Sequence, residues 1–255
     1  MRATSIEFRL RLLILVVFVG LGYWAPWLGS GLAAGLNAAP AGSRISLLEW
    51  LALQVSRVGI LPFAAATPAV IILASLLAAL GAVLRVGGTA WMGSATVNSM
   101  RMHARQVVAD GAYRYVRNPL YLGTWFTIAA ISFTMPASGA AVCMVLVSVF
   151  LLRLVLAEES FLAAQLGAPY AAYVRDVPRL FPRLRPVFPP GKGAPHWGRA
   201  LLAETNALGI LFILAGLSWR YNNALMLRAV LINFGVSLVI RAFLPTAAAP
   251  ATAAP

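Results

Sequence analysis

Gly111-Ala-Tyr-Arg-Tyr-Val-Arg-Asn-Pro-Leu-Tyr-Leu-Gly123 leads into one apolar segment, and Ala157-Glu-Glu-Ser-Phe-Leu162 ends the next. Residues 120–135 are almost wholly apolar, residues 136–139 supply a turn, and residues 140–157 are apolar again apart from Ser148 and Arg153. Two helices that rise about 1.5 Å per residue would each be roughly 25 Å long, so the second returns to the side where the first began. The pattern predicts a membrane hairpin that brings Arg, Tyr and Asn side chains to a glutamate pair at one membrane face.

The composition indicates that a lipid bilayer surrounds most of the chain. Hydrophobic residues are 61% and charged residues 11%, whereas ordinary soluble domains are about 25% charged. Apolar runs that approach the roughly 20 residues of a membrane span lie at residues 12–28, 65–84, 120–135, 140–157, 200–217 and 225–240. Helices satisfy their own backbone groups in lipid, and the alternation of barrel strands is not seen. The predicted fold is all-α, a polytopic membrane helical bundle of about six transmembrane helices plus an interfacial amphipathic helix.

The basic residues orient this bundle. Four of them are expected on the outer face: Arg44, Arg57, Arg220 and Arg228. The positive-inside rule places the other sixteen on the cytosolic face: Arg2, Arg9, Arg11, Arg85, Arg101, Arg105, Arg114, Arg117, Arg153, Arg175, Arg179, Arg183, Arg185, Lys192, Arg199 and Arg241. The net charge of +13 is compatible with nucleic acid, but these residues border apolar spans and accompany no nucleic-acid motif. We therefore expect the membrane as partner, with anionic headgroups as counterions, and no nucleic acid.

Four regions follow from this organisation. They are residues 1–64 with an anchor span and an interfacial helix, the core at 65–185, a two-helix hairpin at 186–244, and a low-complexity tail at 245–255 that is expected to be disordered. Residues 45–63 are apolar enough to span but hold Glu49, Gln54 and Arg57, which favours a helix in the outer interface. The first span is either an anchor or a cleaved signal peptide, and its aromatic ending favours the anchor. The lone Cys143 excludes a disulfide framework and a thiolate metal site.

The polar clusters beside the hairpin need a chemical explanation, because charge near a bilayer is costly unless it is paired or useful. Adjacent Glu158 and Glu159 would repel each other, and three arginines are placed to neutralise them: Arg114, Arg117 and Arg153. One interpretation is an interfacial ion-pair network. The other is a ligand whose ammonium and hydroxyl groups bind carboxylates and whose carboxylate binds arginine. A sulfonium or a purine would then find aromatic faces at Tyr113, Tyr121 and Trp91.

The fifth apolar run contains polar residues. It follows His196 and places Glu204 and Asn206 inside apolar sequence. An intramembrane carboxylate is by default a functional-site candidate that faces the bundle interior, and the alternative is a glutamate paired with Arg199 or Arg220. Two histidines without a clustered partner make no metal site.

Further pieces accompany the two clusters in a fixed order. They are Gly81-Ala-Val-Leu-Arg85 and Gly88-Thr-Ala-Trp-Met-Gly93 upstream, then Gly167-Ala-Pro-Tyr-Ala-Ala-Tyr173 and Val177-Pro-Arg179 downstream. Together with the clusters they cover about residues 67–182. The ordered combination resembles the membrane methyltransferase family of isoprenylcysteine carboxyl methyltransferases and bacterial phospholipid N-methyltransferases.

This resemblance implies an S-adenosyl-L-methionine pocket at the cytosolic mouth of the hairpin, with a tunnel to the lipid for an apolar or amphiphilic methyl acceptor. By position, the residues implied to contact the cofactor are Gly111, Tyr113, Asn118, Pro119, Tyr121, Glu158 and Glu159. Asn118 stands where many relatives carry His, and Asn exchanges hydrogen bonds but does not titrate near neutrality. Pro119 biases Asn118 toward an extended conformation that aims its side chain at the pocket.

The chemistry leaves the catalytic residue open. Methyl transfer from a sulfonium needs alignment and a dry pocket, and positioning accounts for about 7 to 11 kcal/mol in favourable cases. A carboxylate acceptor is ready to attack, whereas an ammonium acceptor must first lose a proton. The candidates for a catalytic role are Arg179, Glu204 and Asp110, and His103 is a further candidate base.

Two other classes of function stay open: a sterol-reductase-like, NADPH-dependent membrane reductase, and a non-catalytic membrane protein that keeps the hairpin as a structural module. The acceptor of a methyltransferase would be a phospholipid amine or an isoprenylcysteine-like carboxylate. Nineteen Arg against one Lys favour a GC-rich bacterial genome, where prenylated cysteines are uncommon. We therefore expect a lipid or lipid-like acceptor and an integral protein of the bacterial inner membrane, with its site on the cytosolic side.

Overall fold

The computed structural model describes residues 3–24, 45–93, 107–186, 188–189, 193–220 and 222–244. Within these ranges the regular structure is helical, and the β-type contact is an isolated bridge between Ser46 and Pro136. The all-α prediction is therefore confirmed. Several residues discussed above lie outside the described ranges: Arg2, Arg44, Arg101, His103, Arg105, Lys192 and the tail 245–255.

The helices follow one another in a simple order. They are α1 (Ser5–Arg9), α2 (Arg11–Trp24), α3 (Leu47–Arg57), α4 (Phe63–Met92), α6 (Pro119–Ser132), α7 (Ala137–Leu166), α8 (Ala168–Asp176), α9 (Trp197–Ala203), α10 (Thr205–Leu217) and α11 (Asn223–Ala242). Two short 3₁₀ helices, η1 (Gly111–Arg114) and η2 (Ser218–Arg220), complete the set.

Each of the six predicted apolar segments contains a helix, but their lengths differ from the expectation. Among the described residues, α4, α7 and α11 are long and apolar enough to cross a membrane, and α9 with α10 forms a fourth candidate bent by 68°. Helix α6 has 14 residues, which is about 21 Å against a hydrocarbon core of roughly 30 Å. Helix α2 covers the described part of the first apolar run, and residues 25–28 of that run lie outside the described ranges. Helix α6 is short because it starts at Pro119 and the chain turns again before Pro136.

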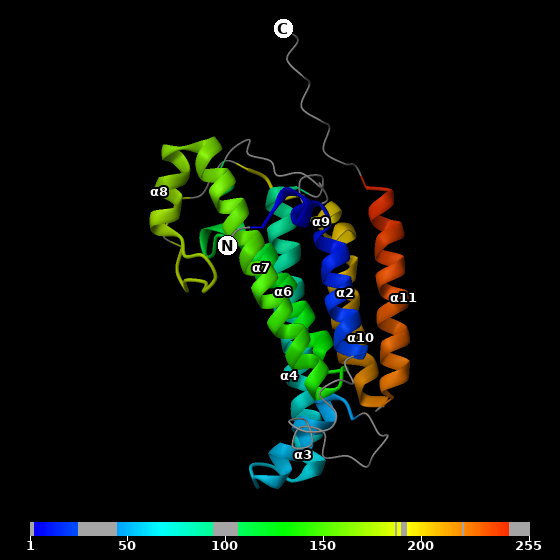
Figure 1. Ribbon diagram of the computed structural model, residues 1–255. Helices are drawn as coiled ribbons and strands as arrows, with labels where there is room; N and C mark the ends of the chain where they lie inside the picture. Colours follow the sequence, from blue (N-terminus) through cyan, green and yellow to red (C-terminus); the bar gives the residue numbers. More distant parts are fainter. Residues whose placement is uncertain are drawn as a thin grey trace.

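The long helices run side by side and give the bundle two ends (Figure 1). Helices α8 and α9 lie at one end, here called the α8 end, and α3 lies at the other, here called the α3 end. The main core lies between α2, α4, α6, α7, α10 and α11, where large side chains such as Met135, Leu154 and Leu214 are fully buried. A second cluster joins α3 to the first half of α4 through Leu48, Ile71 and their neighbours.

Glycines let two helix pairs approach closely. A Cβ added to Gly81 of α4 would lie 2.9 Å from the backbone nitrogen of Thr127 in α6, and one added to Gly123 would lie 3.0 Å from the Gly81 oxygen. Helices α2 and α7 meet in the same way at Gly22 and Gly139. Small residues at such contacts are typical of helix packing in membranes, where dispersion replaces the hydrophobic effect. This packing holds α6 against α4 and so fixes where α6 begins.

Helix α3 has 11 residues and begins with a capping box. The Ser46 side chain accepts a hydrogen bond from the Glu49 backbone nitrogen, and the Glu49 carboxylate accepts one from the Ser46 backbone. The helix ends at Arg57, and α4 begins six residues later at Phe63. Eleven residues rise only about 16 Å, so α3 is too short to span a hydrocarbon core.

Candidate functional site

The turn between α6 and α7 brings the two predicted polar clusters together at the α8 end. Asn118 is the residue that precedes α6, and Pro119 is its first helical residue, a position where the missing proline N–H costs nothing. Helix α7 carries the chain back to Glu158 and Glu159, two turns before it ends at Leu166. The Asn118 amide nitrogen lies 2.9 Å from the Glu159 carboxylate, so the predicted meeting of the clusters is confirmed.

Glu159 is the centre of the cluster. It is 8% exposed and accepts hydrogen bonds from Arg117 at 3.1 Å, from Asn118 at 2.9 Å and from Arg179 at 2.9 Å. Two arginines and an amide satisfy the lone pairs of one carboxylate, as a buried charge requires. The hydrogen bond to Glu159 raises the pKa of Arg179 above its ordinary value, so this guanidinium stays charged.

Glu158 has a different environment. One of its oxygens accepts a hydrogen bond from the Tyr121 hydroxyl at 2.6 Å. Its other oxygen has no hydrogen-bond partner among the described residues, and the side chain is only partly buried. Tyr121 lies one turn into α6 and Glu158 near the last turns of α7, so this contact also ties the two helices together. Glu158 therefore keeps an acceptor atom that a ligand can use.

Two of the arginines expected to neutralise the glutamates do something else. Arg153 donates to the Glu7 carboxylate at 2.7 Å and so fixes α1 to α7. Arg114 donates from Nε to the Phe188 carbonyl at 3.0 Å. The expectation failed because Arg153 lies more than one helical turn before Glu158, on the side of α7 that faces α1. Arg179 takes the place of these arginines at Glu159.

The segment after α8 closes over the start of α6. Arg117 donates from its backbone to the Pro178 carbonyl at 2.9 Å and from Nε to the Val177 carbonyl at 2.7 Å. The Tyr173 hydroxyl donates to the Tyr113 carbonyl at 2.8 Å. Burial raises the pKa of Tyr170, a neighbour in the same cluster, to about 12. The motif residues around 111–118 and 170–179 thus form one packed unit rather than two separate loops.

Gly111 and Tyr113 lie in η1, directly before this unit. Gly111 has φ of +53° and a Cβ there would lie less than 3.0 Å from the Trp91 indole, so both backbone and space require glycine. Tyr113 is 4% exposed, and its burial raises the pKa of its hydroxyl well above the ordinary value. Asp110, which precedes η1, is 9% exposed. The residues implied to line the cofactor site on this side therefore border the end of α4.

Asn118 departs from one expectation. Its φ of −122° is extended, but its ψ of 55° is not, although a following proline favours ψ near +120° to +160°. Its side chain makes no capping bond and donates instead to Glu159 and, at 3.2 Å, to the Arg179 carbonyl. These two bonds hold Asn118 in a position that local preference alone does not select.

Glu204 lies at the break between α9 and α10 and is completely buried. Both of its oxygens bind Arg85, at 2.5 and 2.9 Å, and one accepts a hydrogen bond from Thr89 at 2.6 Å. Arg241 of α11 approaches to 4.0 Å. Arg199 and Arg220, the partners considered from the sequence, are not involved in these contacts. The sequence places Arg85 at the end of an apolar run, but nothing in it indicates that a helix breaks at Glu204.

The network of Glu204 reaches the start of α6. Arg85 also donates to the Thr124 hydroxyl at 2.5 Å, one turn beyond Tyr121. Asn206, the other polar residue of this run, accepts a hydrogen bond from Asn233 of α11 at 3.1 Å. The C-terminal hairpin is thus bonded to the core and to itself by buried polar contacts.

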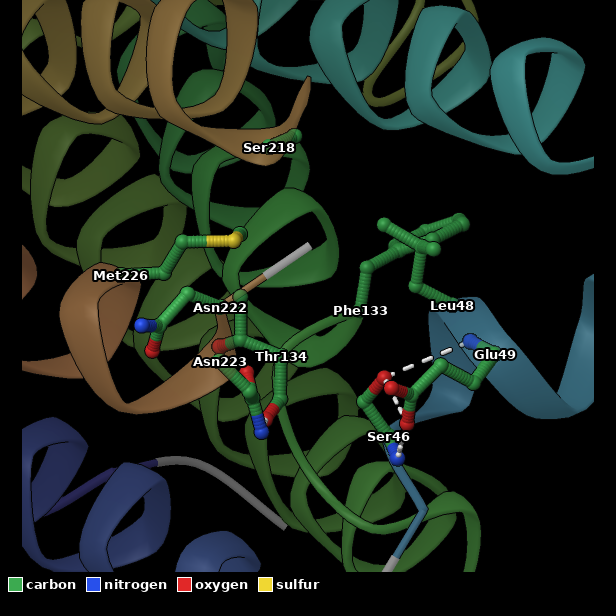
Figure 2. Close-up of a pocket in the computed structure, with 9 residues that line it drawn as sticks. All are labelled: Ser46, Leu48, Glu49, Phe133, Thr134, Ser218, Asn222, Asn223 and Met226. Atoms are coloured by element: carbon green, nitrogen blue, oxygen red, sulfur yellow. Dashed lines mark hydrogen bonds between the residues drawn. The ribbon is translucent and has the colours of Figure 1, made fainter. Parts of the chain in front are cut away.

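A cavity of about 30 Å³ lies at the α3 end, far along the bundle from these residues (Figure 2). It is lined by Ser46, Leu48, Glu49, Phe133, Thr134, Ser218, Asn222, Asn223 and Met226. The Ser218 hydroxyl is buried without a hydrogen-bond partner among the residues that the structure describes, and a space of this size admits a water molecule. Among the described residues that line the cavity, Glu49 alone is charged, so the charged cluster at the α8 end is the candidate functional site.

The donor set at the α8 end fits S-adenosylmethionine. Glu158 offers a carboxylate oxygen for an ammonium or a ribose hydroxyl, and the aromatic Tyr121 stands beside it. Arg11 lies within electrostatic range of Glu158 and Tyr121, and arginine is suited to a carboxylate. The residues present are therefore able to hold each charged part of the cofactor.

Comparison with known proteins agrees with this arrangement. Residues 68–168 match the model of the phospholipid methyltransferase family, a range that runs from the start of α4 to the first residue of α8 and includes Asn118, Tyr121 and both glutamates. Searches of curated proteins and of solved structures found no match. Residues 68–168 are therefore similar to the phospholipid methyltransferase family, in agreement with the resemblance seen in the sequence.

Proposed function

We propose that this protein is an S-adenosylmethionine-dependent methyltransferase whose acceptor is an amphiphilic lipid, with its site at the α8 end of the bundle. The observation that carries the proposal is the contact of Asn118 and Tyr121 with Glu159 and Glu158 inside the phospholipid methyltransferase domain. When bound, the cofactor supplies an electrophilic methyl group on its sulfonium. The protein has to bind it, align it and exclude water.

We assign Glu158 to cofactor binding. Its free oxygen is suited to the ammonium or a ribose hydroxyl of the cofactor, and the Tyr121 hydroxyl holds the carboxylate in place from the other side. Glu159 is assigned a positioning role, because its hydrogen bonds go to Arg117, Asn118 and Arg179. Adjacent glutamates with different partners explain why the motif needs two of them.

Gly111 and Tyr113 are assigned to the wall of the cofactor site next to Trp91. Gly111 permits the close approach to Trp91, and Tyr113 is buried beside it with its carbonyl held by Tyr173. Pro119 fixes the first turn of α6 behind Asn118. These residues align and exclude water rather than transfer protons.

For the acceptor we favour a phospholipid amine over an isoprenylcysteine-like carboxylate, in keeping with the family that residues 68–168 match. An amine must lose a proton before it attacks. Of the candidate bases, Glu204 is held by Arg85 and Thr89, and Arg179 is held by Glu159. Asp110, next to Gly111, is the candidate that stays closest to the assigned cofactor wall.

The test is methyl transfer by the purified protein in vesicles of extracted bacterial lipids, with the methyl group of the cofactor labelled. The expected result is label in the phospholipid fraction and binding of S-adenosylhomocysteine. The matched control is Arg228→Gln, at the other end of the bundle, which should leave both unchanged. Binding of NADPH in place of S-adenosylhomocysteine would contradict the proposal and support a reductase, and binding of neither would support a non-catalytic protein.

A further inference from the structure

The loop after α8 carries two apolar side chains that methyl transfer does not use. Residues 179–186 read Arg-Leu-Phe-Pro-Arg-Leu-Arg-Pro. Phe181 is 86% exposed and Leu184 98% exposed, which makes them the most exposed large apolar side chains in the described part of the chain. They do not belong to a membrane-spanning helix, so lipid contact along a span does not account for them.

Their exposure does not come from an unattached backbone. Arg179 at one end of the loop binds Glu159 at 2.9 Å, and the Arg183 backbone nitrogen donates to the Tyr115 carbonyl at 3.0 Å. Just beyond the loop, the Phe188 ring packs edge-on against Tyr173 with 5.4 Å between ring centres. Because the loop is fixed to the site at both ends, Phe181 is held outward rather than left loose.

The depth of the loop follows from α7. The apolar part of this helix, residues 137–157, is about 32 Å long, close to the roughly 30 Å of a hydrocarbon core. Glu159 stands where that apolar part ends, and Arg179 contacts it. The loop therefore starts at the level where hydrocarbon gives way to headgroups, and Figure 1 shows it on the outside of the bundle, turned back from α8 along α7.

The charge of the loop is one-sided. Arg183 and Arg185 are exposed and form no ion pair within the described part of the chain. Of the acidic residues near the loop, Glu159 is bound to Arg179 and Asp176 lies 3.4 Å from Arg175. Exposed apolar groups beside unpaired arginines match the chemistry of an anionic lipid surface, which offers acyl chains and phosphates at adjoining depths.

We propose that residues 180–185 form a membrane-surface anchor that binds a bilayer containing anionic phospholipid. Phe181 and Leu184 enter the lipid, and Arg183 and Arg185 bind the headgroup phosphates. Through Arg179 and Glu159 the anchor fixes the start of α6 at the depth of the headgroups. This contact goes beyond methyl transfer and does not depend on it.

The test measures depth directly in the full-length protein. Phe181→Cys and Leu184→Cys are made separately in a Cys143→Ala background, labelled with an environment-sensitive fluorophore, and reconstituted into phosphatidylcholine vesicles with or without phosphatidylglycerol. The matched control is Arg175→Cys on the exposed side of α8. With phosphatidylglycerol present, positions 181 and 184 should be quenched by a lipid-attached quencher and be several-fold less accessible to aqueous iodide than position 175.

The arginine contribution is tested in the same assay. Arg183→Gln with Arg185→Gln should reduce the lipid quenching at position 184 in phosphatidylglycerol vesicles to the level seen in phosphatidylcholine alone, whereas Arg57→Gln with Arg228→Gln should not. Equal iodide access at positions 175, 181 and 184 would overturn the anchor. Lipid quenching that is equal with and without phosphatidylglycerol would overturn the role of the arginines. Protection from iodide that disappears when each vesicle holds one copy of the protein would assign the loop to a protein interface instead.

Discussion

The two adjacent glutamates of α7 differ because a helix turns by about 100° per residue, so neighbouring side chains meet different partners. Glu159 faces Arg117, Asn118 and Arg179, whereas Glu158 faces Tyr121 on the neighbouring helix. The hydrogen bonds to Glu159 occupy the positions at which its carboxylate could bind a ligand. Among the described residues, Glu158 has one free oxygen, which can still accept a hydrogen bond from a ligand.

Replacement of each glutamate by Gln should separate these roles. Glu158→Gln should weaken S-adenosylhomocysteine binding tenfold or more and leave thermal stability in detergent nearly unchanged. Glu159→Gln should lower the free energy of unfolding by about 3 kcal/mol, because two arginines lose a mostly buried partner. Calorimetric binding and thermal unfolding of the same preparations measure both effects. Equal losses of affinity at unchanged stability would show that both carboxylates touch the cofactor.

Asn118 should tolerate His better than Ala. A histidine ring can still donate one hydrogen bond to Glu159, whereas Ala removes both bonds of the Asn118 amide and leaves buried acceptors unpaired, at about 1 to 3 kcal/mol. Asn118→His should therefore retain most of the methyl transfer and Asn118→Ala should lose about tenfold or more. Rates across a range of pH, with cofactor affinity measured in parallel, test this. Full activity of Asn118→Ala would remove Asn118 from the site.

At the scale of helices, the break between α9 and α10 is explained by the charge that it accommodates. Glu204 ends α9 and precedes α10, and the 68° bend brings its carboxylate to Arg85 of α4. A buried carboxylate in a membrane bundle is costly unless it is paired. The pair also positions Arg85 against Thr124 of α6, so the C-terminal hairpin supports the first turns of α6.

The effects of single and double variants of this pair on stability should not be additive. Glu204→Leu leaves Arg85 without its carboxylate and should cost about 3 to 5 kcal/mol of unfolding free energy, and Arg85→Met should cost a similar amount. The double variant should cost much less than the sum, because neither charge is left alone. Chemical unfolding in detergent measures the three values. Additive losses would show that the two side chains do not depend on each other.

Two glycines of α2 provide a test of helix packing with an internal control. A Cβ added to Gly22 would lie 2.6 Å from the Met135 sulfur and 2.9 Å from the Cys143 Cβ, whereas one added to Gly20 would meet nothing within 4 Å. Gly22→Ala should therefore destabilise the protein by about 1 to 3 kcal/mol. Gly20→Ala should be neutral or stabilising by about 0.5 to 1 kcal/mol, because Ala loses less entropy in a helix. Thermal unfolding of the two variants measures these effects. Equal changes in stability would contradict the close contact of α2 with α7.

The sequence predicts the hairpin and the meeting of its clusters because both depend on local regularities. An apolar run fixes helix length, and two runs of similar length fix where their ends meet, which is how Asn118 and Glu159 come together. The partners of single charges depend on rotation and bending that no local pattern encodes. Arg153 turns to Glu7, and the bend at Glu204 selects Arg85 over Arg199. The sequence also overestimates α6, which ends at Ser132, because it shows apolar length but not where a helix stops.

At the scale of the whole molecule, the basic residues divide between the two ends of the bundle. Those described at the α3 end belong to α3, η2 and the start of α11: Arg57, Arg220 and Arg228. The site arginines, among them Arg117 and Arg179, lie at the α8 end with the proposed anchor loop. From this asymmetry the positive-inside rule predicts that the α8 end faces the cytosol.

This orientation predicts which positions react with a membrane-impermeant maleimide in sealed cells. In a Cys143→Ala background, Arg57→Cys and Ile60→Cys should be labelled from outside, because both side chains are exposed at the α3 end. Arg175→Cys should be labelled only after the membrane is opened, since α8 lies at the other end. Ile45→Cys should behave like Ile60→Cys, because the 11 residues of α3 between them do not cross the membrane. External labelling at position 175 would contradict the predicted orientation and place the site on the outer side. Labelling of positions 45 and 60 from opposite sides of the membrane would show that residues 45–63 span it.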